Sequence, residues 1–170
     1  MSRILSEFYA QDVLTVAPLL LGKLICRRLN DGSILRGRIN DVEAYRADDT
    51  ACHAYRGRTP RNNVMFEQGG FSYVYLCYGI HNLLNVVTGN EGDPQGVMIR
   101  GIKGVYGPGR VTKALQIDRT HNAVDLRKSD LLWLEDDGFV PTQILTAPRI
   151  GIDYASEIDR ARLWRFFTKD

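Results

Sequence analysis

Residues 71–87 read Phe-Ser-Tyr-Val-Tyr-Leu-Cys-Tyr-Gly-Ile-His-Asn-Leu-Leu-Asn-Val-Val, and this stretch decides the fold. Aromatic and branched residues around a short break are typical of two neighbouring strands, here at 71–78 and 83–87. Alternation along the first strand would put one set of side chains on one face (Phe71, Tyr73, Tyr75 and Cys77) and the other set on the opposite face (Val74, Leu76 and Tyr78).

The pattern on both sides of this stretch predicts more strands than helices. Further strands are expected at residues 24–29, 34–42, 97–102 and 131–134. Turn signals lie at Asn30-Asp31-Gly32 and Gly89–Pro94. Two short helices are expected at 12–21 and 110–116, and the polar segment 47–63 is expected to form a surface loop. Several strands in succession with few helices between them favour an α+β fold with a largely antiparallel sheet.

The composition is that of an ordinary globular protein. The 170 residues are 44% hydrophobic and 25% charged, with a net charge of +2, so bulk charge alone does not indicate a nucleic-acid binder. Only five of the 22 basic residues are lysines. The planar fork of the arginines suits phosphate groups, although a GC-rich genome explains this bias equally well.

Cysteine usage and hydropathy predict an intracellular protein. The three cysteines form no C-x-x-C pair, and the N-terminus lacks the basic and apolar regions of a secretory signal. The longest apolar run, residues 13–26, is broken by Pro18, Gly22 and Lys23 and is not expected to span a membrane. We therefore expect a cytoplasmic protein.

One carboxylate and one cation are placed where chemistry is plausible. Glu43 follows directly on the predicted strand 34–42, so it is either a general base held by a rigid element or an ordinary surface glutamate. Arg100 follows the apolar residues 97–99, where a carboxylate is its expected partner. A Glu43–Arg100 pair would keep the carboxylate ionised.

Aromatic residues gather around the polar segment 47–63. Tyr45, His53 and Tyr55 lie in or beside it, where rings have less to pack against and suit a flat ligand. Tyr73, Tyr75 and Tyr78 are explained either as strand core or as part of the same ligand site.

Familiar catalytic motifs are missing. His53 and His81 have no partners at zinc-ligand spacing, and no G-x-S-x-G, Walker or G-x-G-x-x-G pattern occurs. A hydrolase of this kind would rely on a positioned water. The run Gly107-Pro-Gly-Arg110 is either a structural turn or a source of backbone amides for a phosphate.

Together these residues resemble the alkyladenine (3-methyladenine) DNA glycosylase family, the mammalian type that also occurs in bacteria. The resemblance runs in order along nearly the whole chain, through Glu43–Tyr45, Ala51–His53, Arg58–Asn62, Met65-Phe66, Tyr73–Gly79, Leu84–Val86, Val97–Arg100, Gly107–Gly109 and Pro148–Gly151. It implies a single α+β domain over residues 1–170, with a curved, largely antiparallel β-sheet core, surrounding helices and a protruding β-hairpin.

The resemblance also implies the chemistry. Glu43 would deprotonate a water that Arg100 and the backbone carbonyl of Ile150 help to hold. The water would then cleave the N-glycosidic bond of an alkylated or deaminated purine and leave an abasic site. Because no lysine lies in the core motifs, a monofunctional glycosylase is expected rather than a strand-nicking lyase.

The remaining roles concern binding. Tyr45 would stack on one face of the extruded base, with His53 and Tyr75 on the other, and the backbone amide of His53 would bond the purine. Asn85 would crowd the amine of normal guanine, and Tyr78 would fill the vacated stack from the minor groove. The expected phosphate contacts are Arg58, Arg61, Arg110 and Lys113.

The implied partner is duplex DNA containing a damaged purine, near the nucleoid of a bacterium. No cofactor, metal ion, membrane or obligate protein partner is expected.

Two questions stay open at this level. The segment between Ile102 and Gly107 is shorter than the charged loop usual in the family, through either a deletion or an omitted loop. The competing functions are a catalytically silent sensor of alkylated DNA and a hydrolase of free nucleosides. Glu43 together with Arg100 argues against the first, and an exposed Tyr78 would argue against the second.

Overall fold

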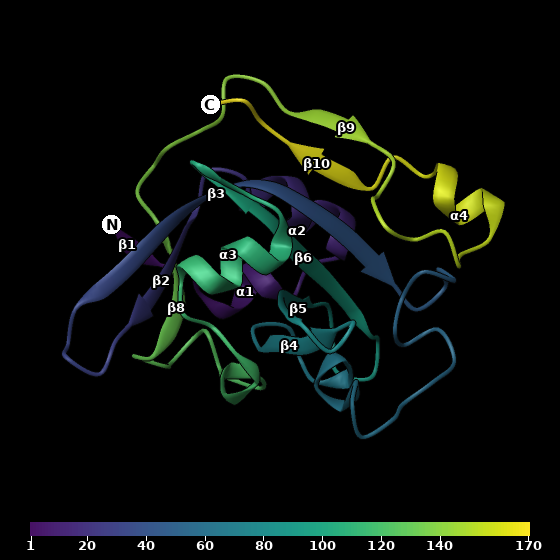
Figure 1. Cartoon of the computed structure of the whole chain (residues 1–170), viewed down its shortest axis with the longest axis horizontal. Coiled ribbons are helices and arrows are strands. Elements are labelled where there is room, and N and C mark those ends of the chain that lie inside the picture. The colour runs from purple at the N-terminus through teal and green to yellow at the C-terminus, as the bar shows by residue number, and fades with distance from the viewer.

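The computed structural model describes residues 1–170, which fold around one antiparallel sheet (Figure 1). The main path of the sheet has the order β1 (Ser2–Arg3), β8 (Leu132–Asp136), β2 (Leu24–Arg28), β3 (Ile34–Arg46), β6 (Gln95–Ile102), β5 (His81–Thr88) and β4 (Ser72–Cys77). Off this path, β10 (Arg165–Phe167) pairs with β3 and with β9 (Leu145–Ala147), and β7 (Val105–Tyr106) pairs with β6. The curved antiparallel sheet with few helices confirms the predicted α+β fold.

Strand β3 organises the sheet because it changes neighbours along its length. Residues 34–38 pair with β2, whereas residues 41–43 pair with β10, and β6 runs along the other side. The register with β6 shifts between Ile39 and Val42, and such a bulge bends a strand and re-aims its side chains. The strand was predicted to end at residue 42, which is wrong: it continues to Arg46, so Glu43 lies inside it.

The structure has four short helices, α1 (Ser6–Tyr9), α2 (Val13–Leu20), α3 (Pro108–Ala114) and α4 (Glu157–Ala161). Helices α2 and α3 pack against strands of the sheet. Asp12 caps α2, its side chain accepting a hydrogen bond from the Leu14 amide at 2.9 Å. Val16 and Leu20 of α2 are fully buried in the main core, each worth roughly 1.5–3 kcal/mol. Helix α3 starts two residues before the predicted 110, because Pro108 suits the first turn of a helix.

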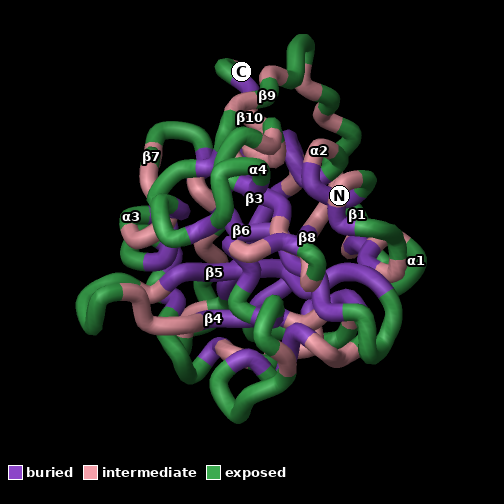
Figure 2. The backbone as a smooth tube through the Cα atoms, turned by 90° about the vertical axis from the view of Figure 1, so that its right-hand side faces the viewer, coloured by how far each residue is buried: buried purple, intermediate pink, exposed green.

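Two 3-10 helices, η1 (Asn63–Phe66) and η2 (Arg119–His121), complete the set, and the central strands form the buried middle of the molecule (Figure 2). No helix is long and apolar enough to cross a bilayer.

Strands β4 and β5 form a hairpin whose turn extends away from the body of the molecule (Figure 2). Tyr78 and Gly79 occupy the middle of this turn with φ values of 51° and 67°. Positive φ is natural for glycine but rare and strained for a tyrosine. The predicted alternation over 71–78 fails here, because Tyr78 lies beyond the end of β4 in this turn.

The segment 47–63 was expected to be a surface loop, and this is only partly right. It forms turns without strands, yet Asp49, Ala51, Cys52 and Asn62 are buried. Its inner side packs beneath the cavity described next, so its polar residues have partners inside the protein.

Candidate active site

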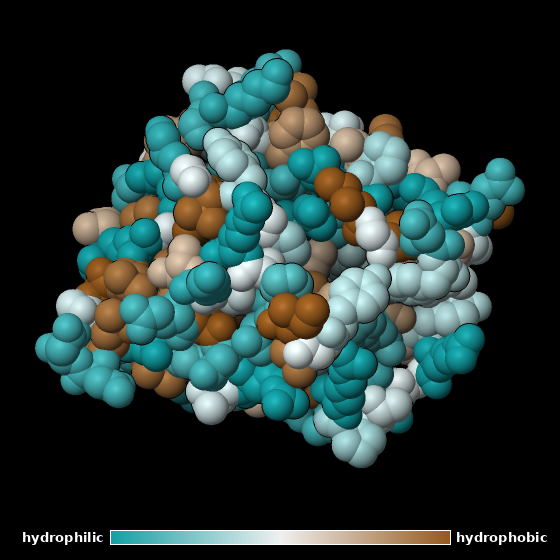
Figure 3. Space-filling view, in the orientation of Figure 1, coloured by the Kyte–Doolittle hydropathy of each residue, from teal (hydrophilic) through white to brown (hydrophobic).

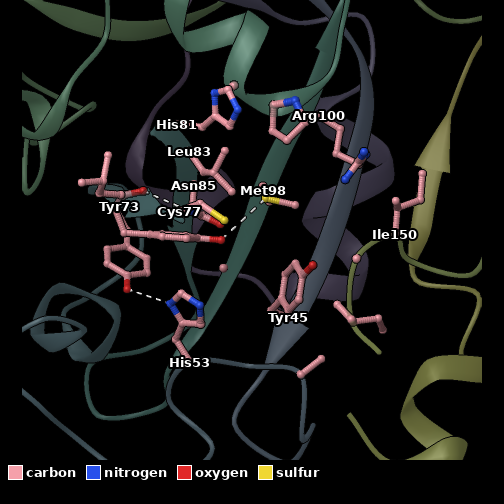
Figure 4. A pocket seen from close by; sticks show the side chains of 18 of the residues that line it. Tyr45, His53, Tyr73, Cys77, His81, Leu83, Asn85, Met98, Arg100 and Ile150 are labelled. Atoms are coloured by element: carbon pink, nitrogen blue, oxygen red, sulfur yellow. Dashed lines mark hydrogen bonds between the residues drawn. The ribbon is translucent and has the colours of Figure 1, made fainter. Parts of the chain in front are cut away.

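A cavity of about 920 Å³ opens between β3, β6, the β4–β5 hairpin and the segment that follows β9 (Figure 4). The space-filling view shows the corresponding hollow near the centre of this face (Figure 3). Its size is at the upper end of the range for small-molecule sites, and its walls are largely aromatic and aliphatic. The structure brings to this one cavity the predicted residues Tyr45, His53, Tyr75, Tyr78, Asn85, Arg100 and Ile150, and also Arg61 and Arg110.

Glu43 lies beneath one wall of this cavity with three hydrogen-bond or ion-pair partners. Its Oε2 accepts a hydrogen bond from the Tyr45 hydroxyl at 2.6 Å. Its Oε1 accepts one from the Ile150 amide at 2.8 Å and lies 3.3 Å from Nη1 of Arg100. The predicted pairing of Glu43 with Arg100 is therefore present, whereas the Ile150 carbonyl accepts no hydrogen bond within the chain.

Opposing forces act on the charge of Glu43. Burial raises the pKa of this carboxyl above its ordinary value, while Arg100, the Tyr45 hydroxyl and the Ile150 amide each pull that pKa back down. A carboxylate with an elevated pKa is a better proton acceptor than an exposed one.

Glu43 itself is 0% exposed and does not form part of the cavity surface. Its partners Tyr45, Arg100 and Ile150 do line the cavity, so the carboxylate lies one layer behind the wall. The alternative of an ordinary surface glutamate is excluded, because the Glu43 side chain is fully buried and β3 is paired on both sides here, with Met98 of β6 and Arg165 of β10.

The Tyr45 ring rests on a buried ion pair that the sequence did not reveal. The guanidinium of Arg149 lies 4.8 Å from the centroid of the Tyr45 ring and 5.1 Å from that of Trp164. It donates hydrogen bonds to the carbonyl of Ala44 at 2.9 Å and to both oxygens of Asp49, and both charged side chains are 0% exposed. The only sequence signal was the Pro148–Gly151 motif, which marked the segment without saying what Arg149 contacts.

The facing wall consists of His53, Tyr73 and Tyr75. The His53 ring lies 4.4 Å from the Tyr75 ring, centroid to centroid, and its Nδ1 is 2.9 Å from the Tyr73 hydroxyl. Loss of solvent and the nearby Arg61 lower the pKa of His53, so the ring is neutral near pH 7. In Figure 4 the Tyr45 and His53 rings lie on opposite sides of the open space.

The floor of the cavity holds Asn85 and Met98. Asn85 is almost fully buried and donates a hydrogen bond to the carbonyl of Tyr73 at 3.1 Å. Cys52 lies in the same cavity, and burial raises the pKa of its thiol to about 12, so it is not a thiolate nucleophile near pH 7.

Of the predicted DNA-contacting residues, Tyr78, Arg61 and Arg110 line the cavity, whereas Arg58 and Lys113 lie outside its lining. Tyr78 is 88% exposed at the tip of the hairpin. Arg110 and Lys113 are exposed on α3. Arg58 lies over the ring of Phe66, and Arg61 donates a hydrogen bond to the carbonyl of Leu76 at 3.0 Å, so each already has a partner within the chain.

No group of three or more histidine, cysteine, aspartate or glutamate side chains is arranged to hold a metal ion. The chemistry available in this cavity is that of a buried carboxylate, an adjacent guanidinium and a set of aromatic rings.

Comparison with known proteins shows the family to which the chain belongs. The sequence pattern of the family described as methylpurine-DNA glycosylase (MPG) matches residues 7–107 and 103–170. The chain belongs to this family. Similar proteins include one from Borrelia garinii subsp. bavariensis, 45% identical with 96% of this chain and 94% of the relative covered. Others come from Methanocella arvoryzae (42% identical, 96% and 91% covered) and Psychrobacter cryohalolentis (41%, 89% and 85%). All three are provisionally named 3-methyladenine DNA glycosylases.

The two segments that match the family pattern overlap at residues 103–107. Here Lys103 and Gly104 form a two-residue turn between β6 and β7, and Gly104 supplies a φ of 83°. Residues 103 and 104 thus join β6 and β7 as a tight hairpin turn.

Proposed function

We propose that this protein is a monofunctional DNA glycosylase, acting as a single domain over residues 1–170, that releases alkylated purines from duplex DNA. The observation that carries the proposal is the buried Glu43–Arg100 pair, 3.3 Å apart, behind the wall of an aromatic cavity. Membership of the methylpurine-DNA glycosylase family and the names of the relatives favour 3-methyladenine as a substrate.

The extruded base enters the cavity between Tyr45 on one side and His53 with Tyr75 on the other. Stacking between aromatic rings is the usual way to hold a flipped base. The amide of His53 makes no hydrogen bond within the chain, so it is free to donate one to the purine. Asn85 lies on the cavity floor, where it crowds the exocyclic amine of guanine.

The attacking water binds beside Oε1 of Glu43. Because Glu43 is fully buried, one of its partners must shift to admit this water. The Arg100 contact, at 3.3 Å, is longer than the Tyr45 contact, at 2.6 Å, so Arg100 is the partner that we expect to shift. The free carbonyl of Ile150, next to the amide that bonds Glu43, completes the water site.

In the reaction, the water oxygen attacks C1′ of the sugar and Glu43 takes its proton. The N-glycosidic bond breaks, its electron pair leaves with the purine, and a hydroxyl remains on C1′. An alkylated purine carries positive charge and leaves as a neutral base, so no strong acid catalyst is needed. Negative charge on Glu43 also stabilises the cation-like sugar in the transition state.

The proposal is tested with duplex DNA methylated by dimethyl sulfate, following release of 3-methyladenine by chromatography. The wild-type protein releases the base and leaves abasic sites that break only on heating. Glu43→Gln lowers the rate by about 10²–10⁴-fold, the usual contribution of a positioned base, while still binding methylated duplex. Glu67→Gln, outside the cavity, serves as the matched control.

Each other outcome contradicts the proposal in its own way. Binding of methylated duplex without any release by the wild-type protein would indicate a silent lesion sensor. Equal cleavage of free methylated nucleosides would indicate a nucleoside hydrolase. Strand breaks without heating would indicate a lyase.

A further inference from the structure

The Tyr45 side chain presents two different parts to two different neighbours. Its ring lines the cavity, where the proposed function places the base. Its hydroxyl points away from that space and donates a hydrogen bond to Oε2 of Glu43 at 2.6 Å. Because residues i and i+2 of a strand share a face, β3 itself brings the two side chains together.

The short distance fits a neutral phenol donating to an ionised carboxylate. Oxygen–oxygen distances of about 2.5–2.7 Å are typical of such charge-assisted bonds. Burial, followed by the charge of Glu43, raises the pKa of Tyr45 well above its ordinary value, so its proton stays on the phenol oxygen. Tyr45 therefore acts as a donor throughout the pH range in which Glu43 titrates.

The rest of the surroundings hold Tyr45 in this position. Arg149 supports the ring from 4.8 Å and also binds the carbonyl of Ala44, the residue between Glu43 and Tyr45. Arg149 is in turn held by the buried carboxylate of Asp49. The hydroxyl thus reaches Glu43 from a ring whose place is set by a separate ion pair.

We propose that the Tyr45 hydroxyl is a positioning group for the reaction: it occupies Oε2 of Glu43 and leaves Oε1, beside Arg100 and Ile150, as the edge that activates water. This inference rests on the proposed glycosylase function and adds to it. The ring serves recognition and the hydroxyl serves catalysis, so a single substitution separates the two.

The hydroxyl also affects when Glu43 is ionised. Burial raises the pKa of Glu43, and the Tyr45 hydrogen bond is among the contacts that lower it again. The charged groups that act on Glu43 from the surrounding elements are Arg100 of β6, Asp41 of β3, Arg165 of β10 and Arg149. All of them remain in Tyr45→Phe, so the change isolates the hydroxyl.

Removal of the Tyr45 hydroxyl should change both the pKa of Glu43 and the rate of base release. Without the hydroxyl donor, the ionised form of Glu43 is less stable relative to the neutral form, so the pKa of Glu43 rises further. Because the ionised form is the proposed base, the acidic limb of the rate profile must move to higher pH. Loss of the fixed carboxylate orientation lowers the rate on the plateau as well, by about tenfold, the scale of a hydrogen bond to a charged group.

The experiment measures single-turnover release of 3-methyladenine from dimethyl-sulfate-treated duplex between pH 5 and 9, for wild type, Tyr45→Phe and Tyr45→Leu. Tyr45→Phe is expected to lose about tenfold in rate with its acidic limb shifted upward. Its preference for methylated over unmodified duplex, measured in a Glu43→Gln background, stays within about threefold because the ring is retained. Tyr45→Leu loses both rate and preference.

Tyr9→Phe is the matched control, since the Tyr9 hydroxyl is buried, remote from the cavity and without a hydrogen-bond partner. It should leave the pH profile unchanged. If the wild-type protein is active but Tyr45→Phe keeps the wild-type rate and pH profile, or loses only affinity, the positioning role is wrong. If the wild-type protein releases no base, the proposed function fails, and the role of the hydroxyl fails with it.

Discussion

The two walls of the cavity are built by opposite means. The polar wall, formed by β3, β6 and residues 148–151, holds Glu43 and the Arg149–Asp49 pair with no exposed side-chain surface. The aromatic wall, formed by the β4–β5 hairpin and residues 52–62, grades from the buried Tyr73 to Tyr78, which is 88% exposed. Charge needs partners on every side when it is buried, whereas rings serve as contact surfaces wherever they are held.

This difference shows where the sheet places the proposed catalytic carboxylate and where it places the ring proposed to contact DNA. Glu43 lies in the middle of a strand paired on both sides, where its carboxylate has little freedom. Tyr78 lies in a strained turn that projects from the sheet, where its exposed ring is accessible to a large partner such as duplex DNA. Replacements in the buried Arg149–Asp49 pair should therefore affect folding, and replacements at the hairpin tip should affect binding.

The largest expected effect is on stability, in the polar wall. Asp49→Asn leaves the guanidinium of Arg149 buried without its counter-charge, which we expect to lower the free energy of unfolding by about 3–5 kcal/mol. Asp130→Asn is the matched control, because Asp130 is 85% exposed in its pair with Arg3 and should change stability by about 0–1 kcal/mol. Urea denaturation measures both, and equal effects would remove the contrast between buried and exposed pairs.

A smaller effect, on binding, is expected at the tip of the aromatic wall. Tyr78→Ala removes the ring proposed to fill the vacated stack, and affinity for methylated duplex should fall by about tenfold, the scale of one stacked base. Thermal unfolding should be unchanged or slightly improved, since alanine at this exposed turn loses no packing. Unchanged affinity would rule out the wedge role, and marked destabilisation would contradict the assignment of the tip to binding.

The smallest effect is expected from the exposed cations on α3, Arg110 at the cavity edge and Lys113 outside the cavity lining. Arg110→Ala and Lys113→Ala should each weaken binding to methylated and unmodified duplex equally, by a few-fold at moderate salt. The slope of log affinity against log salt should become shallower by about one for each phosphate that a substitution leaves without its cation. A change in preference for the lesion would show that these side chains bind more than phosphates.

How much of the fold and of the candidate site could be predicted from the sequence differs between residues. The strand pattern at 71–78 and 83–87 identified the hairpin, because side-chain alternation is a local property. The alternation did not predict where the Tyr78 side chain points. Strand β4 ends at Cys77, and the positive φ of Tyr78 in the following turn sets the direction of its ring. Likewise, the position of Glu43 directly after the predicted strand 34–42 suggested a strand end, but β6 continues the pairing past it to Arg46, and β10, more than a hundred residues later, pairs with Glu43 from the other side.

The sequence by itself determined the fold class and the family resemblance, because these depend on local periodicity and on residue identity, and the resemblance named many of the residues that meet in the cavity. Only the tertiary structure decided that Glu43 is buried behind the wall, that the Ile150 amide bonds it, and that Asp49 neutralises Arg149 beneath Tyr45. These contacts join residues about a hundred positions apart, and the burial of a charge depends on everything that packs around it.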